Sequence, residues 1–246
     1  MPFTPAHPAL VLPLIRWRYI SATALIIGSM APDFEYFFKM SVNGEHGHTL
    51  WGMLYFDLPV TFLLAWLFHA VVKRNAIHNL PVFLQRKFQD TLALDFRKYF
   101  KSHPAVFFFS ALAGTASHLL WDGFTHRYGY FANAIPAYNK IFVPYDGVNY
   151  PLFYALQNIS SGVGLAIVLL YVLVKKPTDN AGAIMYRPSL VYWILLAAIM
   201  LAVVALRFSI KSSDYDLGNA VVTTVSGLLV ALVLCGWINF KNQASS

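Results

Sequence analysis

Five long apolar runs decide what this chain can fold into. A helix needs about 20 mostly apolar residues to cross the hydrocarbon core of a bilayer. Inside lipid, only helices and closed barrels satisfy every backbone polar group. With 58% hydrophobic and 12% charged residues, the chain lies well outside ordinary soluble composition. The sequence therefore predicts an all-α, polytopic integral membrane bundle of about five transmembrane helices, forming one domain over residues 1–246. The predicted spans cover residues 57–72, 105–124, 155–174, 190–208 and 219–237, the last three forming a C-terminal transmembrane part over 155–240.

Two shorter apolar pieces, residues 8–15 and 20–31, precede these spans. Each is too short to cross a bilayer, and arginines lie between them. We expect a hairpin of two short antiparallel helices, which would bring His7 close to Asp33 at its two ends. Basic residues follow the first apolar piece instead of preceding it, so no cleaved leader is predicted.

Residues 73–104 are basic and amphipathic, with phenylalanines between the cations. Such a segment is typical of a helix lying along a membrane surface, with its rings in the apolar layer and its cations among headgroups. The net charge of +7 is therefore interpreted as membrane topology and affinity for anionic lipid, and no nucleic-acid partner is expected. The single cysteine, Cys235, excludes a disulfide framework within the chain.

Lys and Arg are concentrated in the segments 73–104 and 175–189 and are sparser on the opposite side of the predicted spans. By the positive-inside rule, the two basic segments are cytoplasmic. The opposite side, including the hairpin and loop over 1–56, is then extracytoplasmic. The chemically reactive side chains all fall on that side: His7, Asp33, His46, His48, Asp122 and His126.

The stretch SHLLWDGFTH places three metal-binding side chain types four residues apart. On an α-helix, His118, Asp122 and His126 project from one face. Neutral imidazole and carboxylate suit zinc or a similar first-row ion. The alternative is that His118 and Asp122 form hydrogen bonds with neighbouring helices in a buried place.

Three more donors precede the first span, namely His7, Asp33 and His48. His7 or Asp33 alone is typical of a capping or loop residue, and only joint placement with the helical set favours a metal centre. Together the six exceed the needs of one tetrahedral zinc ion. One ion with additional hydrogen-bonding partners, or two ions, would account for them.

The segments MPFTPAHPALVLPL, SATALIIGSMAPDFEYF, HTLWGMLYFDLP and SHLLWDGFTH together resemble a family of bacterial integral membrane proteins known as domain of unknown function 4184. This resemblance covers most of the chain. The family is similar to YdjM-like metal-dependent hydrolases of the inner membrane and, more distantly, to zinc-dependent phospholipase C. The resemblance implies a multi-pass protein of the bacterial cytoplasmic membrane with a helical zinc site.

Phospholipases of that type bind zinc through scattered His and Asp residues and a His-x-x-x-Asp pair. His118 with Asp122 matches that pair, Asp33 a Pro-Asp motif, His48 a His-Thr motif and His7 an early histidine. A further downstream histidine corresponds to His126. The chain departs from the phospholipases because it lacks a secreted soluble body and a free mature N-terminal ligand.

The leading hypothesis is a membrane-bound, zinc-type hydrolase at the extracytoplasmic interface. Its substrate would be a phosphodiester or ester of a lipid or lipid-linked molecule. A metal lowers the pKa of a bound water from about 15.7 toward about 7, and a nearby carboxylate can accept the proton. Asp33, Asp122, Glu45 and Asp146 are the candidate bases, and the aromatic loop 125–150 could shape a cleft for a headgroup.

Two other functions compete with hydrolysis. A closed, non-catalytic metal could fasten the N-terminal hairpin to the second span. An ion-coupled transporter could use buried ionisable residues as an ion path. The transporter is disfavoured because the last three spans carry almost no charge at mid-depth.

Overall fold

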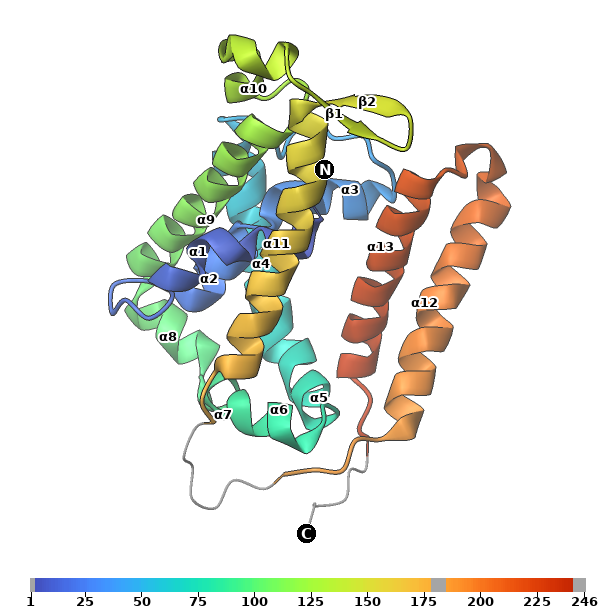
Figure 1. Ribbon diagram of the computed structural model, residues 1–246. Coiled ribbons are helices and arrows are strands. Elements are labelled where there is room, and N and C mark those ends of the chain that lie inside the picture. The colour runs from blue at the N-terminus through green and yellow to red at the C-terminus, as the bar shows by residue number, and fades with distance from the viewer. Residues whose placement is uncertain (1–2, 178–184, 241–246) are drawn as a thin grey trace. The chain divides into compact units, whose positions relative to one another are not determined.

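The computed structural model describes residues 3–177 and 185–240 of the chain, which are mostly helical (Figure 1). Five helical segments are long and apolar enough to cross a membrane. This confirms the prediction of a helical membrane protein: four predicted spans fall within one segment each, and the predicted span 219–237 ends one residue after the fifth segment. The segments are Met53–His78, Pro104–Ala134, Leu152–Val174, Leu190–Ile210 and Leu217–Gly236.

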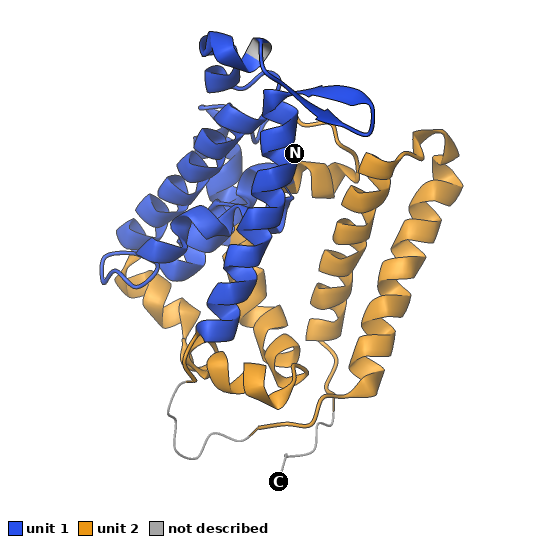
Figure 2. Cartoon of the chain, viewed as in Figure 1, with its two compact units in different colours: residues 1–33, 45–62, 104–174 blue, residues 34–44, 63–103, 175–246 orange. Residues whose placement is uncertain are grey.

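The chain divides into two compact units, each assembled from separate stretches of sequence (Figure 2). The first contains Met1–Asp33, Glu45–Phe62 and Pro104–Val174. The second contains Phe34–Gly44, Leu63–His103 and Lys175–Ser246. The single domain expected over 1–246 stays a prediction.

In the first unit, short helical turns precede and pack around the long helix α9. The long helices of this unit are α9 (Pro104–Thr125) and α11 (Leu152–Val174), and α4 (Leu58–Leu67) begins in it. The short elements are η1 (Thr4–Ala6), α1 (Pro8–Val11), η2 (Leu12–Leu14), α2 (Ala22–Gly28), η3 (Ala31–Asp33) and η4 (Met53–Asp57). The N-terminal region thus forms shorter helical pieces than the two helices expected over 8–15 and 20–31.

Helix α2 packs against α9 with almost no side chain between the two backbones. A Cβ atom on Gly28 would lie 2.5 Å from the carbonyl oxygen of Ala111, and one on Gly114 would lie 2.4 Å from that of Leu25. Small residues permit such close contact between helices. The Thr115 hydroxyl also donates to the carbonyl oxygen of Gly28 at 3.3 Å. This contact fixes the end of α2, and the Asp33 turn that follows it, beside the middle of α9.

The connection between α9 and α11, predicted as a loop over residues 125–150, contains regular secondary structure. It forms α10 (Tyr130–Ala134), η6 (Pro136–Asn139) and a β-hairpin of β1 (Phe142–Tyr145) with β2 (Val148–Pro151). Asp146 and Gly147 both have positive φ, 48° and 73°. An Asp-Gly pair with two positive φ angles is the turn that a two-residue hairpin favours.

The second unit contains an antiparallel helical pair, α12 (Leu190–Ile210) and α13 (Leu217–Gly236), joined by η7 (Ser212–Asp214). Tyr192 and Leu196 pack against Ala231 and Cys235 in its buried core. Helix α3 (Phe34–Lys39) is held on α13, because the Ser226 hydroxyl donates to the carbonyl oxygen of Phe37 at 2.8 Å.

The basic segment 73–104 folds as four short helices of the second unit, which follow η5 (Phe68–Val72). Buried amide side chains fasten it to the segment before α12. Gln85 accepts from the backbone N–H of Tyr186 at 3.0 Å and donates to its carbonyl oxygen at 2.6 Å. Asn79 accepts from the N–H of Ser189 at 2.8 Å. The four helices are α5 (Lys73–His78), α6 (Val82–Lys87), α7 (Gln89–Ala93) and α8 (Phe96–Ser102).

We expect Gly114→Ala to destabilise the protein, because its Cβ would meet the Leu25 carbonyl oxygen at 2.4 Å. Overpacking of this kind costs about 1–3 kcal/mol. Thermal unfolding in detergent measures the loss. The matched control is Gly162→Ala on α11, where nothing lies within 4 Å of the added Cβ. Equal melting temperatures for the two variants would contradict the close contact.

Candidate metal centre

The His118 ring is oriented by a backbone carbonyl. His118 is fully buried on α9, and its Nδ1 lies 2.8 Å from the carbonyl oxygen of Ser29, just after α2. A carbonyl oxygen only accepts, so Nδ1 carries the hydrogen and the Nε2 lone pair is directed into the cluster. Metal-binding histidines are commonly oriented in this way. The same close contact of α2 with α9 therefore sets the position of this ring.

Three ligand atoms form a triangle around one point. The Nε2 atoms of His118 and His48 are 3.3 Å apart. Asp33 Oδ1 lies 3.4 Å from His48 Nε2 and 3.6 Å from His118 Nε2. Tetrahedral ligands held at about 2.0–2.2 Å from zinc are roughly 3.3–3.6 Å from one another. The spacing of the triangle therefore fits a single small ion.

Asp122 faces two sets of rings with its two carboxylate oxygens. Its Oδ2 lies 3.3 Å from His118 Nε2 and 3.4 Å from His48 Nε2. Its Oδ1 lies 3.7 Å from His7 Nε2 and 3.5 Å from His126 Nδ1. Two groups of three donors result, each with ligand atoms within 4.8 Å of one another: His7, His118 and Asp122, and Asp33, His48 and His118. These buried groups could hold a metal ion.

Several of these atoms lack a hydrogen-bond partner among the described residues. They include both ring nitrogens of His7, Asp33 Oδ1 and both carboxylate oxygens of Asp122. The His7 ring is buried and stacks on His118 with 3.7 Å between centroids. Buried polar atoms are normally hydrogen-bonded, and a bound cation would satisfy these carboxylate oxygens and one ring nitrogen of His7.

Burial and neighbouring charges shift the pKa values of His7, Asp33 and His48, the cluster residues that lie outside the five long apolar segments. Burial, with a contribution from His118, lowers the pKa of His7 to about 3, so its ring is neutral. Burial opposes ionisation of Asp33, but the His118 and His48 rings outweigh it and lower the carboxyl pKa. Burial likewise opposes protonation of His48, but the Asp122 and Asp33 carboxylates raise its pKa to about 9. The metal-free cluster therefore carries a proton on His48 that a metal would displace.

The structure brings the six predicted metal ligands together, whereas two of the predicted bases lie outside the cluster. His7, Asp33, His48, His118, Asp122 and His126 converge in the first unit. The candidate base Glu45 is exposed and belongs to neither group of three among the described residues. Asp146 is exposed in the turn of the β-hairpin. The catalytic roles of Asp33, Asp122 and Glu45 stay predictions.

Two contacts that support the cluster were not predicted from the sequence. The Thr4 hydroxyl donates to Asp33 Oδ2 at 2.6 Å, which leaves Oδ1 for the cluster. Gly47 lets the His48 loop reach Pro32, because a Cβ there would lie 2.4 Å from the Pro32 carbonyl oxygen. The glycine beside His48 was a visible signal, whereas nothing in the sequence pairs Thr4 with Asp33.

Comparison with known proteins places the whole region of this site in one family. The family model described as Domain of unknown function (DUF4184) matches residues 1–237, and the chain belongs to this family. No curated protein and no solved structure matches the chain.

We expect His118→Ala and Asp122→Ala to lose bound metal, because His118 belongs to both groups of three and Asp122 faces His48 and His7 with its two oxygens. Elemental analysis of protein purified in detergent measures metal per chain. His103→Ala, which changes an exposed histidine of the second unit, is the matched control and should retain the metal of the unchanged protein. Unchanged metal content in both cluster variants would contradict the site.

We expect metal binding to release a proton from His48. At about pH 7.5 the metal-free ring is protonated, because its pKa is about 9, whereas the His7 ring, with a pKa of about 3, has no proton to lose. Calorimetric titration of the metal-free protein with zinc, in buffers of different ionisation enthalpy, counts the protons. His48→Gln should release about one proton fewer. Equal release from both proteins would show that His48 is neutral before binding.

Proposed function

We propose that this member of the DUF4184 family is a membrane-bound, zinc-type hydrolase. It acts at the extracytoplasmic membrane interface on a phosphodiester or ester of a lipid or lipid-linked substrate. The observation that carries the proposal is the unequal exposure of the cluster. The side chains of His48 and His126 are 26% and 28% exposed, whereas those of His118 and Asp33 are fully buried. A catalytic metal needs an open position, and these two partly exposed histidines leave the cluster accessible.

A metal held by these residues would supply Lewis acidity and a bound water of lowered pKa. Asp122 is the carboxylate that we assign as base. Both carboxylate oxygens of Asp122 face the cluster, one toward His48 and the other toward His7. In contrast, one oxygen of Asp33 accepts a hydrogen bond from Thr4. Substrate would reach the metal past His48 and His126.

The membrane setting of the proposal follows from charge. By the positive-inside rule, the basic segment 73–104 is cytoplasmic, and so are the ends of the spans that adjoin it. We therefore propose that the five helices cross the bacterial cytoplasmic membrane with the cluster facing outward. The relation to YdjM-like hydrolases and to zinc-dependent phospholipase C, suggested by the His and Asp motifs, belongs to the same proposal.

A closed structural metal is the competing function. The complete burial of His118 and Asp33, with His7 nearly as buried, favours it, because structural sites keep four protein ligands and exclude water. In that case the metal would fasten the N-terminal turns to α9 without turnover.

We expect the purified protein in vesicles to hydrolyse members of a phospholipid and lipid-phosphate panel. Chelator should abolish the activity and zinc should restore it. Asp122→Asn, with kcat expressed per bound metal ion, should lower kcat by about 10²–10⁴-fold if Asp122 transfers a proton. His103→Ala is again the control with unchanged activity, because its side chain is exposed in the second unit. Full metal occupancy without turnover on any member of the panel would contradict the hydrolase and favour the structural metal.

A further inference from the structure

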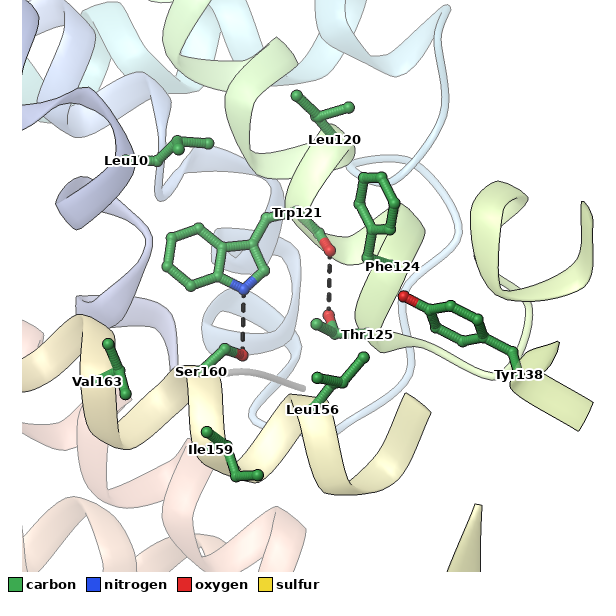
Figure 3. A pocket seen from close by; sticks show the side chains of 10 residues that line it. All are labelled: Leu10, Leu120, Trp121, Phe124, Thr125, Tyr138, Leu156, Ile159, Ser160 and Val163. Carbon is green, nitrogen blue, oxygen red and sulfur yellow. Dashed lines mark hydrogen bonds between the residues drawn. The ribbon is translucent and has the colours of Figure 1, made fainter. Parts of the chain in front are cut away.

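A groove of about 550 Å³ lies in the first unit. Figure 3 shows the side chains that line it. Helices α9 and α11 form its two walls, and α1 and η6 contribute one residue each. Its apolar lining includes Leu10, Leu120, Phe124, Leu156, Ile159 and Val163. The volume is within the range of about 300–1,000 Å³ that is usual for ligand pockets.

The polar side-chain atoms of Trp121, Ser160 and Thr125 in the walls are bonded within the protein. Trp121 Nε1 donates to Ser160 Oγ at 3.2 Å, and Ser160 Oγ donates to the Gln157 carbonyl oxygen at 3.2 Å. The Thr125 hydroxyl donates to the Trp121 carbonyl oxygen at 3.2 Å (Figure 3). These groups are therefore already paired, and the walls offer a ligand mainly hydrocarbon contact. An extended apolar chain satisfies such a groove better than a polar metabolite does.

The groove lies at the same end of α9 as the metal cluster. Its α9 residues run from Leu120 to Thr125, and Asp122 lies between them in the sequence. On α11 it extends from Leu156 to Val163, a rise of about 10 Å at 1.5 Å per residue. Both helices are long and apolar enough to cross a membrane, so lipid tails would surround this face.

The Trp121 side chain contacts both the groove and the cluster. Its ring lines the groove and lies edge-on to His7, with 5.6 Å between centroids. Leu10, three residues after His7, lines the groove beside it. At the outer end, Tyr138 from η6 brings a phenolic ring of the kind found at membrane–water interfaces. The groove thus runs from the proposed interface into the depth of the spans, one aromatic ring away from the metal ligands.

We infer that this groove binds one acyl chain of a membrane lipid. That the polar end of the same lipid is the group cleaved at the cluster rests on the proposed function. An acyl chain in the groove would hold the headgroup linkage near the mouth of the cluster, where His48 and His126 are partly exposed. The substrate class is then a diacyl or monoacyl lipid, and a water-soluble phosphodiester would lack this binding contribution.

Photolabelling tests the inference with the full-length protein in nanodiscs. The probe is phosphatidylglycerol with a diazirine at the end of one acyl chain, present in trace amount in dioleoylphosphatidylcholine. Tandem mass spectrometry locates the label. We expect the groove residues Leu120, Phe124 and Leu156 to carry several-fold more label than Leu169 and Leu170, which are exposed on α11 outside the groove.

Leu156→Trp fills the groove, because Leu156 points into it between the two walls (Figure 3). We expect it to lower groove labelling by about ten-fold, which corresponds to one decade of affinity. Leu169→Trp adds the same bulk to the same helix outside the groove and should leave groove labelling unchanged. Metal content is measured on each sample, and a Leu156→Trp protein that keeps its metal is correctly folded around the cluster.

Equal labelling inside and outside the groove, or equal groove labelling in the two variants, would overturn the inference. Enriched labelling that Leu156→Trp removes supports it even where the lipid panel shows no hydrolysis, so the groove is tested separately from the hydrolase. Active protein whose turnover is the same for long-chain and water-soluble phosphodiesters would overturn the role of the groove in substrate binding while leaving the hydrolase intact.

Discussion

The candidate site depends on the close contact between α2 and α9. Gly28 and Gly114 bring the two backbones together, and this contact carries the Ser29 carbonyl to His118. The carbonyl fixes both the orientation and the tautomer of the ring. The turn that continues from α2 places Asp33 3.6 Å from the same ring. Without these glycines, side chains would separate the helices and the donors from remote segments would not meet.

Long-range features of the fold followed from the sequence because a bilayer imposes a simple rule. About 20 apolar residues in a row mark a span wherever they occur, and the five apolar runs needed no knowledge of their neighbours. The His118 and Asp122 pair was equally visible, because a spacing of four is a local property of a helix. The β-hairpin was not predicted, although its Asp146-Gly147 turn is a local signal, because residues 125–150 were expected to form a loop.

The partners of the ligands could not be predicted in the same way. Thr4 and Asp33 are separated by 29 positions, and Ser29 and His118 by 89, and no periodic pattern connects either pair. Such contacts depend on how helices pack in three dimensions. The sequence identified which side chains could bind a metal, whereas the packing determined that Asp122 contacts both His48 and His7.

The bond from His118 Nδ1 to Ser29 limits the stoichiometry of the centre. An imidazole whose Nδ1 donates a hydrogen bond has a lone pair only on Nε2, so His118 can bind only one ion at a time. Two ions would have to differ in their ligands, and Asp122 is the carboxylate that faces both positions. A dinuclear form would therefore be asymmetric, because only one of the two ions could take the His118 nitrogen.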